Sequence, residues 1–271
     1  DEDAVADGYT FGEPVLSEDK IIISGPKTYV DKVERAVVDV AFSSNEELTE
    51  PYSAECAISV EGTGVEASYL TFAPKSDEDK PISTVTVTLP VLKVMNLPVS
   101  VDIDDKPSGF DSSKMRIYYS VSKLQAGVLD SSTIKSATIG SISFKDLKTG
   151  INKFTFDVTD LEGIAVIDDI KSINVTVSVD SGFTRKTVTI NPSDIKITGV
   201  AKDKTATLSN VSSRRITVYV PDADKDATIT LGVKCDMGNE GESGTYPLTF
   251  TVKGSPSAWV YGDYTADVTI K

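Results

Sequence analysis

The side chains most able to do chemistry in this sequence are closely spaced carboxylates. Asp222, Asp224 and Asp226 alternate in the run DADKD, which begins like the calcium loop of an EF-hand. Such a loop requires glycine at its sixth position and glutamate at its twelfth, where this sequence has Ala227 and Val233. A solvated connector is the alternative, and the two mismatches favour it.

A second acidic group consists of Asp102, Asp104 and Asp105, at a predicted junction between two repeats. It could hold a cation that stiffens the junction, or it could stay hydrated. Paired carboxylates could also serve a glycosidase, but nothing distinguishes one pair among 41 acidic residues. We therefore predict no metal site.

Histidine, the commonest general base and a common metal ligand, is absent from the sequence. A Ser, Thr or Cys nucleophile requires an activating base, so only rarer arrangements remain. The sequence also lacks a GxGxxG motif or another phosphate-binding glycine loop. We predict a protein that is not an enzyme and has neither catalytic residues nor a cofactor. A carboxylate-based enzyme is a distant alternative.

The net charge of −14 disfavours polyanionic partners. This charge repels phosphate backbones, and no basic cluster offsets it, so we expect no nucleic-acid binding. No apolar run approaches the roughly 20 residues of a membrane helix. The opening DEDAVADG fits an exported protein trimmed of its leader or anchor, and it fits a cytoplasmic protein equally well.

Cys56 and Cys235 are the two cysteines of the chain. They could pair if the first and last repeats touched. Two thiols in a chain of this length do not make a disulfide framework, so we expect two small buried residues on strands.

The elements are dominated by alternating apolar and polar residues, which predict strands. The stretch from Val85 to Ile103 alternates, pauses at Pro90 and alternates again from Val99, which predicts two strands in line with a hinge between them. A weaker copy runs from Val175 to Ile190, and DVTIK at the C-terminus resembles its first half.

Three landmarks recur in the same order and predict a tandem repeat. Opening strands lie at Ile21, Ile117 and Ile216, which are 96 and 99 residues apart. Middle strands end at Val60, Val158 and Val252, and closing strands begin at Val85, Val175 and Val268. The predicted fold is mostly β, with tandem small β-rich domains and short helices in an elongated chain. The predicted boundaries are 8–103, 104–192 and 193–271.

Two helical segments are expected among the strands. Tyr29, Val30 and Val33 share one face at helical spacing, which predicts a helix of about two turns over Lys27 to Arg35. The stretch from Leu129 to Ile134 is less regular and is expected to hold one helical turn.

Aromatic residues provide the candidate contact surface. Tyr118, Tyr119 and Tyr219 lie on predicted strands, where packing within the protein is the usual role. Trp259, Tyr261 and Tyr264 cluster near the C-terminus. Aromatic residues are enriched at interface centres, so these three are the candidate partner contact.

The residues of the first predicted repeat resemble the YbbR-like repeat. The resemblance is carried by ISGP at Ile23 to Pro26, by YVDKV at Tyr29 to Val33 and by the hinge LPVLKVMNLPV. The second and third repeats match more loosely. SGTYPLTFTV and GDYTADVTIK resemble the final repeat of such proteins. The resemblance covers nearly the whole chain.

The resemblance implies a bacterial, non-catalytic, extracytoplasmic protein held at the cell membrane by an N-terminal anchor that this chain lacks. CdaR-type members of this family regulate a membrane-bound diadenylate cyclase, which makes cyclic di-AMP. The implied partner is therefore a membrane protein of that kind. The alternative is a structural or adhesive cell-surface β-repeat protein.

Overall fold

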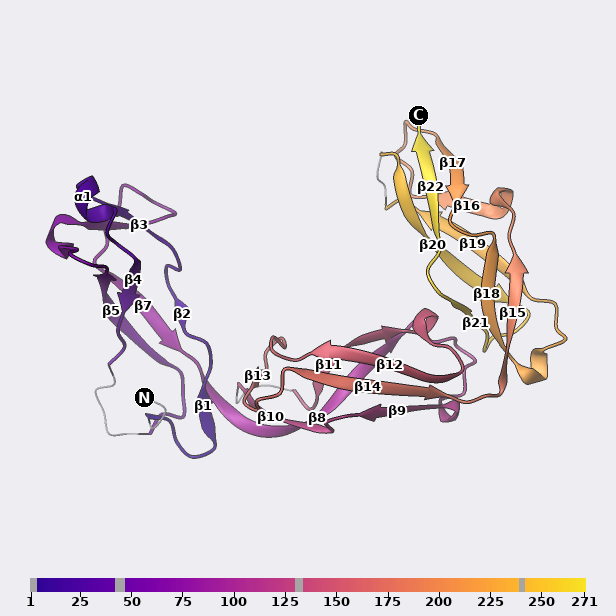
Figure 1. Ribbon diagram of the computed structural model, residues 1–271, viewed down its shortest axis with the longest axis horizontal. Helices are drawn as coiled ribbons and strands as arrows, with labels where there is room; N and C mark the ends of the chain where they lie inside the picture. Colours follow the sequence, from indigo (N-terminus) through magenta and orange to yellow (C-terminus); the bar gives the residue numbers. More distant parts are fainter. Residues whose placement is uncertain (1–3, 42–46, 130–133, 239–241) are drawn as a thin grey trace. The chain divides into compact units, whose positions relative to one another are not determined.

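The computed structural model describes residues 4–41, 47–129, 134–238 and 242–271. The fold is mostly β, as predicted: several small sheets are joined by turns and short 3-10 segments, and these ranges contain one short α-helix, α1 (Lys27–Val30) (Figure 1). The chain forms two compact units, each made of three separate segments. Unit 1 comprises 1–98, 123–137 and 159–170, and unit 2 comprises 99–122, 138–158 and 171–271.

Unit 1 contains a four-stranded antiparallel sheet in the order β2-β7-β5-β4 and a two-stranded pair, β3-β6. Their bounds are β2 (Val15–Leu16), β3 (Ile21–Ser24), β4 (Arg35–Val38), β5 (Tyr52–Glu61), β6 (Thr71–Pro74) and β7 (Thr84–Leu89). A third set of strands follows the order β1-β8-β10-β13, with the first part of β8 in unit 1. These strands are β1 (Tyr9–Phe11), β8 (Val91–Asp104), β10 (Lys123–Val128) and β13 (Ala165–Val166).

Unit 2 contains a three-stranded sheet in the order β12-β14-β9 and another in the order β15-β18-β21. Their strands are β9 (Met115–Tyr119), β12 (Gly150–Asp157), β14 (Ser172–Val179), β15 (Phe183–Thr189), β18 (Arg215–Pro221) and β21 (Trp259–Tyr261). A five-stranded sheet has the order β16-β19-β20-β22-β17. It is built from β16 (Ile195–Thr198), β17 (Ala206–Val211), β19 (Thr230–Asp236), β20 (Gly244–Lys253) and β22 (Thr265–Ile270). The remaining strand, β11 (Ala137–Ser143), pairs with β8.

One strand order occurs in three sheets and is the structural counterpart of the sequence repeat. Each predicted middle strand pairs antiparallel with the predicted closing strand, in β5-β7, β12-β14 and β20-β22. A third strand flanks the closing strand on its other side: β2, β9 or β17. The middle and closing landmarks are therefore equivalent strands in the three sheets.

The three opening landmarks are not equivalent to one another, because only one of them lies in such a flanking strand. Ile21 lies in β3, which pairs with β6, and Ile216 lies in β18, which pairs with β15 and β21. Only Ile117, in β9, lies beside its closing strand. The boundaries 8–103, 104–192 and 193–271 stay a prediction, because strand order does not locate the ends of a repeat.

The predicted hinge segment forms two successive strands, β7 and β8, separated by Pro90. The second strand begins at Val91 rather than Val99 and continues to Asp104. Proline cannot donate to a ladder, which favours strand ends. Pro98 fits this rule, because its pairing with Lys123 is the last step of the β8-β10 ladder. The second copy forms β14 and β15, with Asp180 to Gly182 between them.

Two local predictions need correction. The helix over Lys27 to Arg35 is only α1, a single turn that ends at Val30, and β4 begins at Arg35. The helix buries no residue, so no packing energy extends it. The less regular stretch after Lys123 contains β10, and most of the predicted turn at Leu129 to Ile134 lies outside the described residues.

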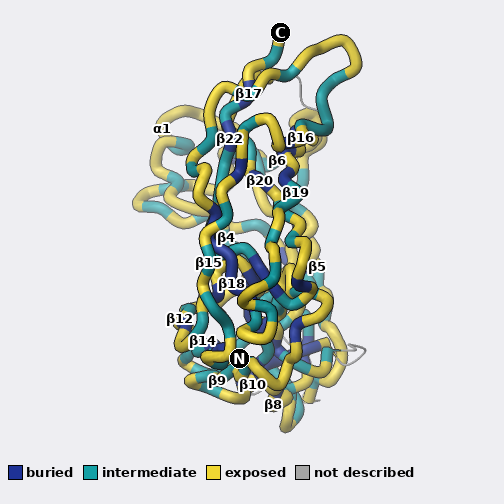
Figure 2. The backbone as a smooth tube through the Cα atoms, turned by 90° about the vertical axis from the view of Figure 1, so that its right-hand side faces the viewer, coloured by how far each residue is buried: buried dark blue, intermediate teal, exposed yellow. Residues whose placement is uncertain are grey.

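Each unit contains an apolar core cluster. In unit 1, a small core joins Cys56, Val85, Val87 and Leu89. In unit 2, a core cluster includes Ile216, Val218 and Val220 of β18, a strand that is largely coloured as buried in Figure 2. Cys56 and Cys235 are both buried and unbridged, as expected for small residues on strands, and burial raises the pKa of the Cys235 thiol.

Candidate functional site

The candidate site lies in unit 2, where five aromatic rings from separate elements pack together. We call this group the aromatic joint. Phe110 comes from the β8–β9 connection, Phe144 from a 3-10 turn after β11, and the other three begin or lie within β15, β18 and β21. Its members are Phe110, Phe144, Phe183, Tyr219 and Trp259. Their contacting ring centroids are 4.8 to 6.0 Å apart, in stacked and edge arrangements typical of aromatic packing.

Trp259 contacts the other four rings of the joint. Strand β21 holds it opposite Tyr219 of β18, and its side chain is only 4% exposed. The indole Nε1 donates a hydrogen bond to the carbonyl oxygen of Leu147 at 2.8 Å. A buried indole needs such an acceptor, so packing and polarity both fix Trp259 in place.

Backbone contacts reinforce the joint on both sides of Trp259. The Gly262 N–H donates to the carbonyl oxygen of Lys145 at 2.8 Å, and the Gly109 N–H donates to that of Pro256 at 3.2 Å. The Ser257 hydroxyl also donates to the carbonyl oxygen of Gly109. A β-carbon at Gly109 would lie 3.0 Å from backbone and side-chain atoms of Pro256, so glycine permits this close approach.

The predicted contact group has three different environments. Trp259 is buried, which places it within the joint rather than on the surface. Tyr261 is half-buried against Tyr219, with ring centroids 5.8 Å apart. The Tyr264 hydroxyl donates to the carbonyl oxygen of Tyr261 at 3.1 Å and accepts from the Thr217 N–H at 2.9 Å. That these three residues contact a partner stays a prediction.

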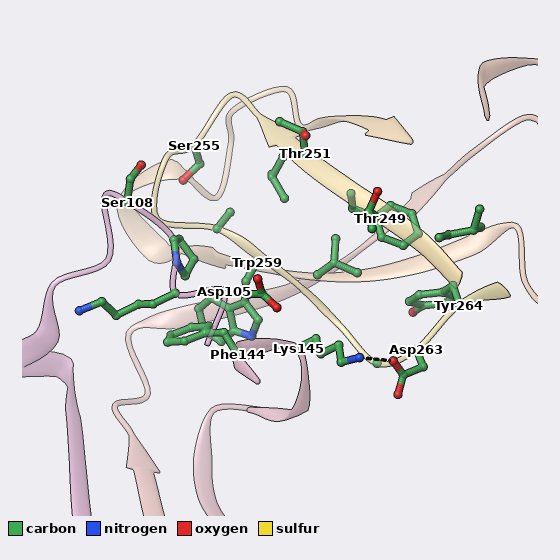
Figure 3. Close-up of a pocket in the computed structure, with 18 of the residues that line it drawn as sticks. Asp105, Ser108, Phe144, Lys145, Thr249, Thr251, Ser255, Trp259, Asp263 and Tyr264 are labelled. Atoms are coloured by element: carbon green, nitrogen blue, oxygen red, sulfur yellow. Dashed lines mark hydrogen bonds and ion pairs between the residues drawn. The ribbon is translucent and has the colours of Figure 1, made fainter. Parts of the chain in front are cut away.

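An open cavity of about 650 Å³ lies beside the joint (Figure 3). Phe144 and Trp259 form its apolar wall, while Asp105, Lys145 and Asp263 contribute charged groups. The run 247–252 of β20 lines it without interruption. Since alternate residues of a strand point to opposite faces, an uninterrupted run means that the cavity adjoins the edge of β20.

A salt bridge spans one side of this cavity. The Lys145 Nζ lies 2.6 Å from the Asp263 Oδ1, as the dashed line in Figure 3 shows. The hydrogen bond to Asp263 raises the pKa of Lys145, against the opposing effect of partial burial. Partial burial raises the pKa of the neighbouring Asp146, and the charge of Lys145 opposes that shift.

We expect Asp263→Asn to destabilise unit 2 by less than about 1 kcal/mol at pH 7, because exposed ion pairs contribute little. The side chains of Lys145 and Asp263 are 46% and 71% exposed. Because the pKa of Lys145 is higher in the folded than in the unfolded protein, its protonated form stabilises the fold. This stabilisation is complete below the unfolded-state pKa of about 10.4 and is lost as the pH rises through the folded-state pKa. Urea unfolding of the wild-type protein and of Asp263→Asn between pH 7 and pH 11 measures this pH dependence.

The matched control is Asp203→Asn, since Asp203 is exposed and the described residues offer it no ion pair. Its effect on unfolding is expected to stay near zero at every pH. A wild-type advantage over Asp263→Asn that remained constant up to pH 11 would contradict the assignment to Lys145.

The acidic groups considered from sequence have structural partners. The Thr184 hydroxyl donates to Asp222 and the Ser255 hydroxyl donates to Asp224, both at 2.6 Å. Ser143 donates to Asp105 at 3.3 Å. Over the part of the chain that the structure describes, no three His, Cys, Asp or Glu side chains gather as a metal site. The same part contains no helix long and apolar enough to cross a membrane.

Sequence reasoning missed three residues of the joint, Phe110, Phe144 and Phe183. Phe110 ends the polar turn DDKPSGF, and a lone aromatic residue in such a turn was an available signal. It is 6% exposed, and Phe144 is 1% exposed. The aromatic joint holds loops and strands of unit 2 together by packing and hydrogen bonds.

Comparison with known proteins gave one solved structure. The chain is similar to a YbbR-like protein from Streptococcus pneumoniae TIGR4, with 15% sequence identity and a TM-score of 0.22. The match covers 84% of this chain and 99% of that chain. No protein-family model matches the sequence, and no curated protein matches it. The solved structure has the same family name as the resemblance described from the sequence.

Proposed function

We propose that this chain is the extracytoplasmic part of a non-catalytic YbbR-domain protein that regulates a membrane-bound diadenylate cyclase by protein–protein contact. In this proposal an N-terminal anchor holds the full-length protein at the cell membrane. The motifs ISGP, YVDKV and LPVLKVMNLPV support the family. The observation that carries the proposal is the strand order shared by three sheets, which supports a tandem repeat of one β-rich unit.

The residues around the cavity support action by contact rather than by chemistry. Lys145 is held by Asp263, and Ser255 donates its hydroxyl to Asp224. A general base must be unprotonated and a nucleophile must reach its substrate, whereas Asp263 raises the pKa of Lys145 and Ser255 is only 2% exposed. The proposed protein therefore binds its partner and alters the partner's activity without a reaction of its own.

The test is a pull-down from bacterial membranes with the full-length anchored protein, followed by measurement of cyclic di-AMP synthesis. The expected result is a diadenylate cyclase in the eluate and a rate of synthesis that changes when the protein is removed. The control is the same anchor joined to an unrelated folded domain. An eluate without the cyclase, or unchanged synthesis, would overturn the proposal and favour a structural or adhesive surface protein.

A further inference from the structure

The outer face of the β9–β14–β12 sheet in unit 2 combines exposed apolar and basic side chains. Its inner face is the buried side of the sheet, with Ile173, Val175 and Val177 fully buried. The opposite face carries the alternate residues: two from β9 with Ser120 directly after it, four from β14 and four from β12, where the last row is Ser172 and Asp157. We call the nine residues of the other three rows the outer face: Arg116, Tyr118, Ser120, Asn174, Thr176, Ser178, Ile151, Lys153 and Thr155.

The strand register arranges the outer face in three rows. One row is Tyr118, Thr176 and Lys153, and the next is Arg116, Ser178 and Ile151. The third row is Ser120, Asn174 and Thr155, in which the Thr155 hydroxyl donates to the Asn174 side-chain oxygen at 2.8 Å. Strands lie about 4.8 Å apart and alternate residues about 6.8 Å apart, so the face measures roughly 10 by 14 Å.

Two large apolar side chains are exposed on this small face. Tyr118 is 55% exposed and Ile151 is 63% exposed, although Tyr118 was expected to pack within the protein. Only small polar side chains, Thr176 and Ser178, separate them on the central strand. Each apolar side chain has a basic neighbour two residues along its own strand, Arg116 or Lys153. The result is a flat apolar and basic surface rather than a hydrated polar one.

The charge of the outer face is opposite to that of the chain. Its nine residues include two cations and no carboxylate, and the next row of the same sheet adds one carboxylate, Asp157, so cations still outnumber carboxylates there. The whole chain has a net charge of −14. Arg116 and Lys153 form no ion pair with any residue in the described ranges. Two cations beside a tyrosine and an isoleucine are complementary to a surface that offers carboxylates next to apolar groups.

We propose that the outer face docks an acidic surface of a partner protein, whose carboxylates pair with Arg116 and Lys153 while Tyr118 and Ile151 bury apolar area. Tyrosine and arginine are the residues that most often dominate binding energy in protein interfaces. An anionic membrane fits less well, since electrostatic attachment uses clusters of 4–8 basic residues and the net charge of this chain opposes it. This inference rests on the proposed function in taking the partner to be the regulated membrane protein.

The test places the photo-crosslinking residue p-benzoylphenylalanine at Tyr118 or Ile151 of the full-length protein in its own cells. Tyr69, 54% exposed in unit 1, is the control position. The expected result is an adduct with another protein from both test positions, mapped by mass spectrometry to an acidic segment. Position 69 is expected to give no such adduct.

Charge reversal then tests the electrostatic part of the proposal. Arg116→Glu with Lys153→Glu is expected to reduce the adduct about tenfold or more, since like charges oppose binding, whereas Arg116→Lys with Lys153→Arg should retain it. The matched control is Lys196→Glu with Lys234→Glu, an exposed cross-strand pair in unit 2. It changes the net charge by the same amount and should leave the adduct intact.

Several outcomes would overturn the outer-face proposal: an adduct with a second copy of this chain, an adduct with lipid, none above the level at position 69, or one that resists charge reversal. A cyclase recovered in the membrane pull-down without an adduct from positions 118 and 151 would reject the outer face alone. A charge-sensitive adduct with a different acidic protein would reject the cyclase and retain the outer face.

Discussion

Trp259→Ala is expected to destabilise unit 2 by about 3–5 kcal/mol, the usual cost of truncating a fully packed tryptophan. The substitution removes a side chain that contacts four aromatic rings and is 4% exposed. It also leaves the Leu147 carbonyl oxygen without its indole donor. Equilibrium unfolding in urea followed by circular dichroism measures the loss, with the unit 2 transition moving to lower denaturant.

Two variants separate the contributions to this effect. Trp259→Phe keeps a ring but loses the N–H donor, so its cost should be smaller and include the roughly 1–3 kcal/mol of an unsatisfied buried carbonyl. Tyr118→Ala removes an aromatic side chain that is 55% exposed and should change stability by less than about 0.5 kcal/mol. Equal losses for Trp259→Ala and Tyr118→Ala would show that the joint does not hold unit 2 together.

Gly254→Ala is expected to destabilise unit 2 by about 2–6 kcal/mol. Gly254 follows β20 with φ +98°, a backbone conformation that residues with a β-carbon rarely adopt, and such strain costs about 1–3 kcal/mol. An added β-carbon would also overlap the carbonyl oxygen of Thr228, and relieving such an overlap costs about 1–3 kcal/mol more. The same urea unfolding experiment measures the sum.

Gly150→Ala is the matched control for the overlap. Gly150 has φ +89°, but a β-carbon there would meet no described atom within 4 Å. This variant should therefore show the conformational cost without the displacement of neighbours, about 1–3 kcal/mol. If the two glycine variants were equally stable, the overlap of the new β-carbon at position 254 with the Thr228 carbonyl oxygen would contribute nothing to the free energy of unfolding.

Alternation predicted strands with one buried face, such as β14, and failed for several strands that lack such a pattern. Strand β14 alternates throughout, and its buried residues Ile173, Val175, Val177 and Val179 follow that pattern. The flanking strands β2 and β17 were missed, because β2 has two residues and both are exposed, while β17 contains the polar run Ser209 to Asn210. Strand β10 was missed because Gly127 interrupts its apolar pattern.

Period alone misidentified the opening strands. Ile21 and Ile216 lie 96 and 99 residues from Ile117, but they belong to pairs outside the recurring order. Spacing gives only the number of residues between two segments, whereas strand order depends on which backbone groups form hydrogen bonds. An isoleucine-rich run can form a strand in the recurring sheet or in a separate strand pair. Strand pairing, unlike spacing, identifies the equivalent strands of the repeat, which are β7-β5, β14-β12 and β22-β20.

For the candidate site, sequence reasoning found the aromatic cluster near the C-terminus but not its surroundings. The spacing of Trp259, Tyr261 and Tyr264 implies a common location, yet only pairing with β18 shows that Trp259 points into a core. Phe110 lies 149 residues before Trp259, and no local pattern links two positions so far apart. The outer face was equally hidden, since it depends on the register of three strands.

The shared strand β8 determines which shorter versions of this protein can fold. Residues 1–98 contribute only one of the three segments of unit 1, and the β10 ladder that covers residues 93–98 comes from 123–128. A truncated chain ending near residue 103 would therefore leave a bare strand edge, which invites pairing between molecules and aggregation. Recombinant production of unit 1 needs the chain at least as far as residue 170, so a fragment library cut at the predicted repeat boundaries would yield insoluble first pieces.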